Sequence, residues 1–407
     1  MRTSIYKSIS DPKLFKQQLL CWSQQFREII YFDSNDYNQN YSSYDCVVAV
    51  DAFTSIKTDF FNAFEDLKQY QQSTKDWLFG YLSYDLKNDI EQLHSTNFDG
   101  LNFQYLNLCD DEVEADFEEI LECQKSKVET DAMLKIQQRV SKENYLDKVS
   151  KIITHIRQGD IYEANFCMEF FAENATINPI EIFTKLNEIS RPPFAVFFKN
   201  HKHFLLSATP ERYLRKVGDL VVSEPIKGTA KRFLDPLEDE KSKMQLALDP
   251  KERSENIMIT DLVRNDLSRT AQKGSVEVKE LCGIYSFLQV HQMISTVTSK
   301  LDPQYSVVEV IKTTFPMGSM TGAPKISAMK IIEEQEETKR GLYSGAVGYF
   351  APNGDFDFNV VIRSILYNQE KAYVSFSVGS AITSQSVPEK EYEECLLKAK
   401  AMREVLS

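Results

Sequence analysis

Short apolar segments that recur in pairs constrain the fold of this chain more than any other feature of its sequence. Segments rich in β-branched and aromatic residues favour strands and cover residues 161–171, 195–200, 203–208, 220–226, 344–350, 360–367 and 372–380. Longer stretches with apolar residues at helical spacing cover residues 142–158, 254–271, 323–337 and 388–406. Because strands outnumber helices and come in pairs, the sequence predicts an α+β fold with largely antiparallel sheets.

The helix predicted at residues 142–158 marks the start of the more informative part of the chain. Its apolar residues share one face: Tyr145, Val149, Ile152, Ile153 and Ile156. Gly159 is placed to end this helix. The acidic run Asp110–Glu119 comes earlier and is typical of a solvated helix or linker. We predict a boundary near residues 125–140, with an N-terminal α/β region at 1–135 packed on a larger domain at 136–407.

Composition and charge exclude several classes of protein. The 407 residues carry a formal charge of −13, and a general nucleic-acid binder would need a basic face. No apolar run approaches the ~18 residues that span a membrane, and the N-terminus has no signal-peptide core. The seven Cys are scattered without a C-x-x-C pair, and five His are too few for a His-rich metal site. We therefore expect a cytoplasmic protein with reduced thiols, no membrane contact and no nucleic-acid partner.

Two of the predicted helices carry paired carboxylates that could bind a metal ion. Glu252 and Glu255 share a face of one helix, and Glu391 and Glu394 share a face of the last helix. Oxygen ligands from two helices suit a hard cation such as Mg²⁺. The same spacing is also common on solvated helices, where Glu394 and Lys398 would form an ordinary ion pair. Spacing alone leaves both interpretations open.

Lys227 lies in a segment whose neighbours favour a fixed backbone. It follows Pro225 closely and precedes Gly228, which indicates a tight strand end that aims the ammonium group. A solvated surface lysine is the plainer interpretation. A nucleophilic lysine needs a lowered pKa, which burial or a cationic neighbour provides. Lys231 or Arg232 could supply that positive charge.

Residues 315–329, FPMGSMTGAPKISAM, form a glycine-punctuated loop that enters a helix. Free N–H groups at such a helix start could bind an anion. The loop lacks the spacing of a Walker phosphate loop and of a dinucleotide fingerprint. The chain also lacks the G-x-S-x-G, H-E-x-x-H and kinase signatures. The sequence therefore does not predict an ATP- or NAD-dependent enzyme.

Taken together, nine segments resemble the chorismate-utilising enzyme family. They are GDIYEANF, SATPERYL, PIKGTAKR, SENIMITDLVRNDL, VHQMISTV, FPMGSMTGAPKISAM, GLYSGAVGYF, FDFNVVIRSI and VPEKEYEECLLKA, in the family's order from about residue 142 to 402. Each is weak alone, whereas nine in order are a strong signal. The N-terminal third carries no matching motif. The resemblance implies two mostly antiparallel sheets packed together with helices outside, and it makes 136–407 the chorismate-binding catalytic domain.

Two positions indicate a branch within that family. PIKGT is similar to the members that form 4-amino-4-deoxychorismate, whereas anthranilate-forming members usually carry Ala at the position of Lys227. Members that use water usually carry a basic Lys at the position of Glu163, and members that use ammonia typically carry Gln there. Glu163 differs from both and argues against the water-using chemistry, because a carboxylate cannot act as a basic Lys would.

The resemblance also implies a binding role for each matching residue. Glu255 and Glu394 would bind Mg²⁺, with Glu252 and Glu391 close by. The ion would hold the ring carboxylate of chorismate. Other carboxylate contacts would come from Tyr343, Arg363, Lys398 and the backbone N–H groups around Gly379. The family often shows G-x-G at this last position, where this chain has Ala381.

The catalytic roles follow from the same resemblance. Glu211 would be the general acid for the leaving hydroxyl, with His291 and Ser319 as neighbours of that group. Lys227 would attack the ring and expel the C4 hydroxyl, and ammonia would then add at C4 and displace the lysine. A glutamine amidotransferase subunit would supply the ammonia, because this chain shows no glutaminase-type Cys motif. A separate lyase would convert the product to 4-aminobenzoate, the folate precursor.

Two alternatives stay open at this point. The first is an anthranilate-forming synthase of the same family, against which Lys227 and the absence of a Leu-Leu-Glu-Ser element both speak. The second is a non-catalytic subunit that binds chorismate without converting it. Product analysis separates the first from our expectation, and turnover of chorismate at high ammonia separates the second.

Overall fold

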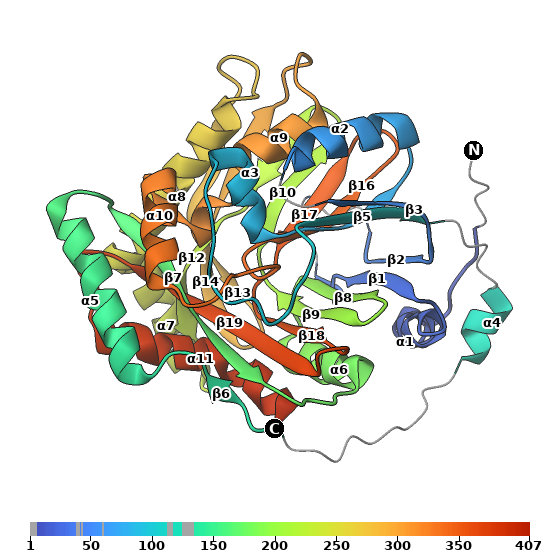
Figure 1. Ribbon diagram of the computed structural model, residues 1–407, viewed down its shortest axis with the longest axis horizontal. Helices are drawn as coiled ribbons and strands as arrows, with labels where there is room; N and C mark the ends of the chain where they lie inside the picture. Colours follow the sequence, from blue (N-terminus) through green and yellow to red (C-terminus); the bar gives the residue numbers. More distant parts are fainter. Residues whose placement is uncertain (1–5, 38–40, 42–43, 59–60, 112–116, 124–133) are drawn as a thin grey trace.

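Two large β-sheets form the framework of the computed structural model, which describes residues 6–37, 41, 44–58, 61–111, 117–123 and 134–407 (Figure 1). The nine-stranded sheet has the order β15 (Gly322–Ala323), β7 (Glu163–Ala172), β19 (Tyr373–Ile382), β18 (Ser364–Asn368), β9 (His203–Thr209), β8 (Phe194–Asn200), β1 (Glu28–Asp33) and β2 (Cys46–Val50), with β6 (Gln137–Gln138) paired to β7.

The second sheet has ten strands. Its order is β12 (Ile226–Lys231), β14 (Val290–Lys300), β11 (Leu220–Ser223), β10 (Arg212–Val217), β17 (Phe356–Val360), β16 (Ala346–Phe350), β4 (Leu78–Leu82), β5 (Leu106–Asp111) and β3 (Ala52–Thr58), with β13 (Glu277–Ser286) paired to β14. All strand pairs in the described ranges are antiparallel, apart from an isolated bridge between Phe98 and Thr338. The predicted α+β fold with antiparallel sheets is confirmed.

The helices lie around the two sheets (Figure 1). They are α1 (Pro12–Ser23), α2 (Ala63–Thr74), α3 (Lys87–Glu91), α4 (Phe117–Glu122), α5 (Lys142–Gln158), α6 (Pro179–Ser190), α7 (Pro236–Leu248), α8 (Pro250–Ser268), α9 (Val307–Thr314), α10 (Lys325–Gln335) and α11 (Pro388–Leu406), with short 3₁₀ turns η1 (Tyr84–Leu86) and η2 (Gly318–Met320). None of the helices in the described ranges is long and apolar enough to cross a membrane.

Helix α5 shows how local sequence sets these elements. Ser141 caps its start by accepting a hydrogen bond from the Asn144 N–H group. Gly159 ends it in the left-handed conformation, with φ at 88° and its N–H group bonded to the last turn. The predicted helix and its glycine stop are both confirmed.

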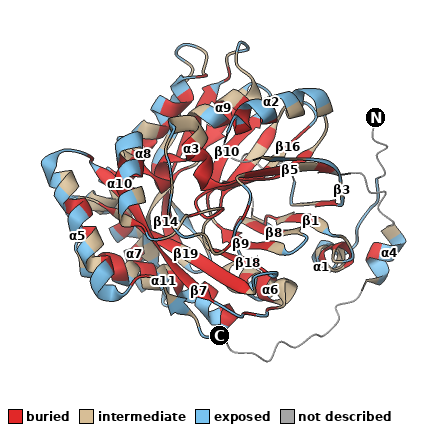
Figure 2. Cartoon of the chain, in the orientation of Figure 1, coloured by how far each residue is buried: buried red, intermediate tan, exposed pale blue. Residues whose placement is uncertain are grey.

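Strand alternation places apolar side chains in two separate cores. On β1, Ile30 belongs to the cluster that draws on both sheets, whereas Ile29 and Tyr31 belong to the cluster that draws on α5, α6 and α11. Successive side chains of a strand point to opposite faces, so one strand serves both cores. Figure 2 shows the buried strands inside and the exposed outer faces of the helices. The nine-stranded sheet is therefore covered on both faces.

One strand prediction is wrong in a way that matters for the site. The apolar stretch 360–367 is not one strand, because β17 ends at Val360 and β18 begins at Ser364 in the other sheet. Arg363 lies in this crossing with φ at 51°, in the left-handed region that non-glycine residues rarely adopt. The chain thus passes from one sheet to the other at Arg363.

The N-terminal strands belong to both sheets. β1 and β2 extend the nine-stranded sheet beyond β8, while β3, β4 and β5 extend the ten-stranded sheet beyond β16. Of the acidic run Asp110–Glu119, residues 112–116 lie outside the described residues, and so do residues 125–133 of the predicted boundary region.

Candidate active site

A β-bulge aims Lys227 into a large cavity. Opposite β14, Ile226 pairs with Ile294 and Thr229 pairs with Gln292, so β12 holds one extra residue between these pairs. The bulge contains Gly228 at a φ of 94°, where an added Cβ would lie 3.1 Å from Met293 Cβ and 3.2 Å from Glu252 Oε2. Glycine therefore lets the strand bend tightly, as the sequence indicated.

The cavity has a volume of about 880 Å³, which is within the size range of small-molecule sites. Strands of both sheets meet α8 and α11 around it. Ten of the predicted site residues line it: Glu211, Lys227, Glu252, Glu255, Ser319, Tyr343, Arg363, Gly379, Glu394 and Lys398. His291 and Glu391 are not among its lining residues. The fold thus collects residues from distant parts of the sequence in one cavity.

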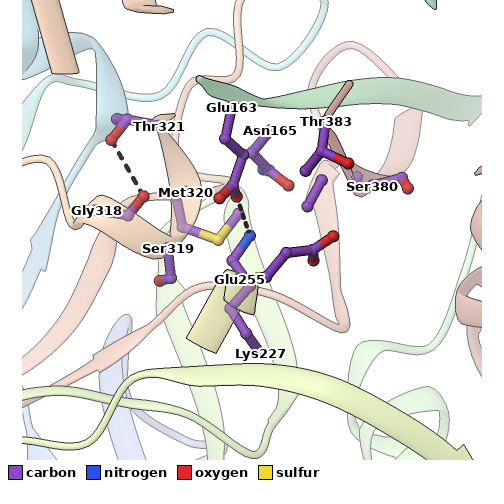
Figure 3. A network of polar contacts seen from close by, with 12 residues as sticks. Glu163, Asn165, Lys227, Glu255, Gly318, Ser319, Met320, Thr321, Ser380 and Thr383 are labelled. Atoms are coloured by element: carbon purple, nitrogen blue, oxygen red, sulfur yellow. Dashed lines mark hydrogen bonds and ion pairs between the residues drawn. The ribbon is translucent and has the colours of Figure 1, made fainter. Parts of the chain in front are cut away.

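Lys227 and Glu163 form a buried ion pair at this site. Lys227 Nζ donates a hydrogen bond of 2.7 Å to Glu163 Oε1, and Figure 3 shows the two side chains pointing toward each other. Glu163 is fully buried, and its Oε2 atom has no hydrogen-bond partner among the described residues. Burial lowers the pKa of Lys227, but the carboxylates of Glu163, Glu255 and Glu211 outweigh it and raise the pKa above its usual value.

The expected effect of cationic neighbours on Lys227 is wrong. Lys231 Nζ lies 5.3 Å from the centre of the Phe233 ring. The Arg232 guanidinium donates to Asp239 at 2.9 Å. The charges that act on the pKa of Lys227 are those of carboxylates, and its Nζ donates to Glu163 Oε1. Lys227 can then act as a nucleophile only after it passes a proton to a neighbouring group.

Glu211 has the properties of a proton donor. It is buried, and its Oε1 accepts a hydrogen bond of 2.7 Å from Ser319 Oγ. Burial raises the pKa of Glu211 to about 7, although the Ser319 bond and the Lys227 charge act in the opposite direction. A carboxyl with a pKa of about 7 holds its proton over much of the neutral range, as a general acid must.

The cationic side chains of the cavity suit an anionic ligand. The Arg363 guanidinium makes no hydrogen bond or ion pair with the described residues, and burial lowers its pKa. Lys398 Nζ donates to Gly379 O at 2.9 Å and lies 2.5 Å from Glu394 Oε1. An added Cβ at Gly379 would lie 2.7 Å from Cys167 Sγ, so the close approach of β19 to β7 requires glycine. Arg363 is therefore the cation best placed to pair with a carboxylate.

The predicted metal ligands lie close to one another but have different partners. Lys251 Nζ lies 3.7 Å from Glu255 Oε1 and 3.4 Å from Glu391 Oε1. Glu391 also accepts a short hydrogen bond from Ser380. Glu255 Oε1 is buried without a hydrogen-bond partner, and burial raises the pKa of Glu255 to about 7. A buried carboxylate oxygen without a partner fits a bound cation.

The spacing of these carboxylates is still wider than that of a formed metal centre. Within the described ranges, no three Asp, Glu, His or Cys side chains lie together closely enough to hold a metal ion. Glu252 and Glu394 line the cavity with Glu255, and all three are oxygen donors of the kind that Mg²⁺ prefers. The donor chemistry therefore fits this ion.

Unlike the other residues to which the resemblance gives a catalytic role, His291 does not line the cavity. Its Nδ1 lies 2.8 Å from Ser286 Oγ and its Nε2 lies 3.1 Å from Asp239 Oδ1, so the ring joins β13 to α7. The next residue on β14, Gln292, lines the cavity and has a buried Oε1 without a partner. Because neighbouring residues of a strand face opposite sides, Gln292 faces the cavity and His291 faces away from it.

Sequence reasoning also missed three residues of the cavity wall, namely Asn165, Lys251 and Gln292. Lys251 precedes Glu255 by four residues, so helical spacing could have indicated their contact. Gln292 and Ile294 alternate on β14 with His291, and period-two alternation could have indicated which of them faces the site. Asn165 lies two residues after Glu163 on β7, so the same alternation could have placed both on one face.

The chain is similar in sequence to a known enzyme family and to several known proteins. A family model described as chorismate binding enzyme matches residues 27–404. The chloroplastic aminodeoxychorismate synthase of Arabidopsis thaliana is 40% identical over 264 residues, which are 64% of this chain and 28% of that protein. Aminodeoxychorismate synthase component 1 of Bacillus subtilis (strain 168) is 36% identical over 266 residues, which are 65% of this chain and 56% of that protein.

Two further relatives bear on function and fold. An anthranilate synthase component I-like protein of Synechocystis sp. is 36% identical over 261 residues, or 64% of this chain and 53% of that protein. The crystal structure of anthranilate synthase component I from Streptococcus pneumoniae superposes with a TM-score of 0.75 at 21% identity and covers 98% of this chain and 94% of that one. The matched residues span less than two thirds of the length of each of the three relatives compared by sequence.

Proposed function

The chain belongs to the chorismate-binding enzyme family, and from this premise we propose that it converts chorismate and ammonia to 4-amino-4-deoxychorismate, as component 1 of an aminodeoxychorismate synthase. The observation that carries the proposal is the position of Lys227. Its side chain enters the large cavity, here called the reaction cavity, beside Glu163 and shares that cavity with Glu211. A nucleophile and an acid in one cavity provide what the displacement of a ring hydroxyl needs.

The proposed reaction begins at Lys227. Its proton passes to Glu163, which is 2.7 Å away, so that the neutral amine can attack the ring. Glu211 gives its proton to the C4 hydroxyl, which leaves as water, and Ser319 orients the carboxyl of Glu211. Ammonia then adds at C4 and displaces Lys227. Arg363 and Lys398 bind the substrate carboxylates and fix the ring against the nucleophile.

Mg²⁺ is the proposed cofactor. Glu252, Glu255 and Glu394 would hold it, and Glu391 would join them if Lys251 moved aside. When bound there, Mg²⁺ would hold a substrate carboxylate and withdraw charge from the conjugated ring. The observation that favours this assignment is Glu255 Oε1, which is buried without a hydrogen bond.

Glu255→Gln is expected to weaken Mg²⁺ binding. Loss of an outer-shell partner alone typically costs a metal site about 10- to 100-fold in affinity, so loss of a ligand should cost at least as much. Isothermal titration of Mg²⁺ measures the change directly, and the Mg²⁺ dependence of turnover gives a second readout. Asp261→Asn, which changes an exposed carboxylate of the same helix, is the matched control. Equal Mg²⁺ affinity in both variants would argue against Glu255 as a ligand.

The product identifies the reaction. We expect chorismate, Mg²⁺ and ammonium salts to yield 4-amino-4-deoxychorismate, which a separate lyase converts to 4-aminobenzoate. With glutamine instead, turnover should require a glutamine amidotransferase subunit. Chromatography with mass detection distinguishes the products, and release of fluorescent anthranilate would contradict the proposal.

Anthranilate formation is the second candidate, and the similarity to the Synechocystis protein favours it. Lys227 argues against it, because anthranilate-forming members of the family usually carry Ala at this position. A third possibility, a subunit that binds chorismate without converting it, would give no loss of chorismate at high ammonia.

A further inference from the structure

A second cavity, of about 20 Å³, shares Glu211 and Ser319 with the reaction cavity. Its remaining wall is mainly apolar and includes Leu214, Val263, Leu267 and Met317. A space of this size holds one molecule as small as water or ammonia. The small cavity therefore adjoins the reaction cavity at the carboxyl group to which we assign the proton transfer to the leaving hydroxyl.

One buried carboxylate of the small cavity has an oxygen without a hydrogen bond. Asp266 is 3% exposed, and its Oδ1 accepts no hydrogen bond from the described residues. Lys325 Nζ binds the other oxygen, Oδ2, at 2.6 Å, and Arg269 Nη2 lies 3.7 Å from Oδ1. Because a buried acceptor without a hydrogen bond is unfavourable, this oxygen suits a small ligand with N–H or O–H donors.

We propose that the small cavity is the ammonia subsite of this enzyme. The inference rests on the proposed function, because it assigns a place to the nitrogen donor of that reaction. Ammonia fits the volume, can donate to Asp266 Oδ1, and as a neutral molecule tolerates the apolar wall. Glu211 lines both cavities, and the C4 hydroxyl has to lie near this residue to receive its proton. Nitrogen would thus reach the carbon that the hydroxyl has left.

The second half of the reaction balances with this arrangement. The ammonia nitrogen forms a bond to C4, the ring double bonds shift back, and the bond between the ring and Lys227 Nζ breaks, with its electron pair returning to Lys227. The new C4 ammonium loses one proton to Glu211, which became a carboxylate when it protonated the departing hydroxyl. Glu211 ends protonated, as it began.

A side chain that fills the subsite should weaken the binding of ammonia without affecting the binding of chorismate. Val263→Ile adds one methylene to the wall, and one methylene changes discrimination in a tight pocket about tenfold or more. We expect the KM for ammonium to rise by about this factor at saturating chorismate, with the KM for chorismate unchanged. The Lys227 adduct should also accumulate in intact-protein mass spectra, because its release by ammonia is slowed.

The matched control is Val50→Ile, which fills a separate cavity, also of about 20 Å³, lined by Ile30, Ala49 and Phe198. It should leave both KM values unchanged. An equal KM for ammonium in the Val263→Ile and Val50→Ile proteins would overturn the ammonia subsite while leaving the proposed function intact.

An enlarged subsite should admit a larger amine. Val263→Ala is expected to raise the use of methylamine relative to ammonia about tenfold, a gain that misfolding cannot produce. An unchanged ratio would overturn the proposal. If the unmodified protein forms no amino product from chorismate and ammonium, the proposed function fails together with the subsite, which is a different result from product formation with an unchanged ratio.

Discussion

Lys227→Ala is expected to abolish the covalent intermediate and to lower the formation of 4-amino-4-deoxychorismate by about 10³-fold or more. The remaining residues can still bind and polarise the substrate, but they offer no second amine within the bulge of β12. Intact-protein mass spectrometry during turnover should show an adduct on the unmodified chain and none on the variant. Lys231→Ala, which removes a cation from the rim of the same cavity, is the matched control and should retain the adduct.

Stability has to be separated from chemistry in this variant. Removal of Lys227 leaves Glu163 buried without its partner, and breaking a buried pair in this way costs about 3–5 kcal/mol. Lys227→Ala combined with Glu163→Gln should recover most of the free energy of unfolding, because the uncompensated charge is gone. The double variant should still form no adduct. An adduct of equal amount on either variant would contradict the role of Lys227 as nucleophile.

Glu211→Gln is the second change with a large expected effect. The amide keeps the size of the side chain and can still bind Ser319, but it cannot give a proton to the hydroxyl. General acid catalysis typically contributes about 10²- to 10⁴-fold, so the rate of adduct formation should fall by that factor. Glu393→Gln, on the exposed face of α11, is the matched control and should leave the rate unchanged.

The pKa of Glu211 predicts the direction in which the rate of adduct formation changes with pH. Burial raises the pKa of Glu211 to about 7, so the acid form predominates below pH 7 and is lost as the pH rises. Adduct formation should therefore show a limb that falls through pH 7, about tenfold for each further pH unit. The loss of a proton from Lys227 acts in the opposite direction. If the falling limb persists unchanged in Glu211→Gln, another group is the acid.

The sequence predicted the regular part of this fold well. The apolar periodicity of residues 142–158 and the stop at Gly159 gave α5, and the β-rich segments gave paired antiparallel strands. The failure at 360–367 has a clear reason. An apolar stretch looks the same whether it stays in one sheet or crosses to another, and only the second case places Arg363 in the cavity.

The sequence indicated some residues of the candidate site and missed others. Motif order indicated which residues take part, and ten of the twelve line one cavity. The strand register turns Gln292, and not His291, toward the cavity, because successive residues of a strand face opposite sides. The contact of Lys251 with Glu391 depends on how α8 lies beside α11, and that arrangement is long-range.

The sequence by itself therefore determined the residue types, their order along the chain and the helix and strand periods, because these follow from local side-chain chemistry. Tertiary structure decided which of these residues face each other. The fold brought Lys227 Nζ to 2.7 Å from Glu163 Oε1, so the pKa of Lys227 is raised where a cationic neighbour would have lowered it. A charge interaction depends on distance and burial, and both are set by the pairing of strands that lie far apart in the sequence.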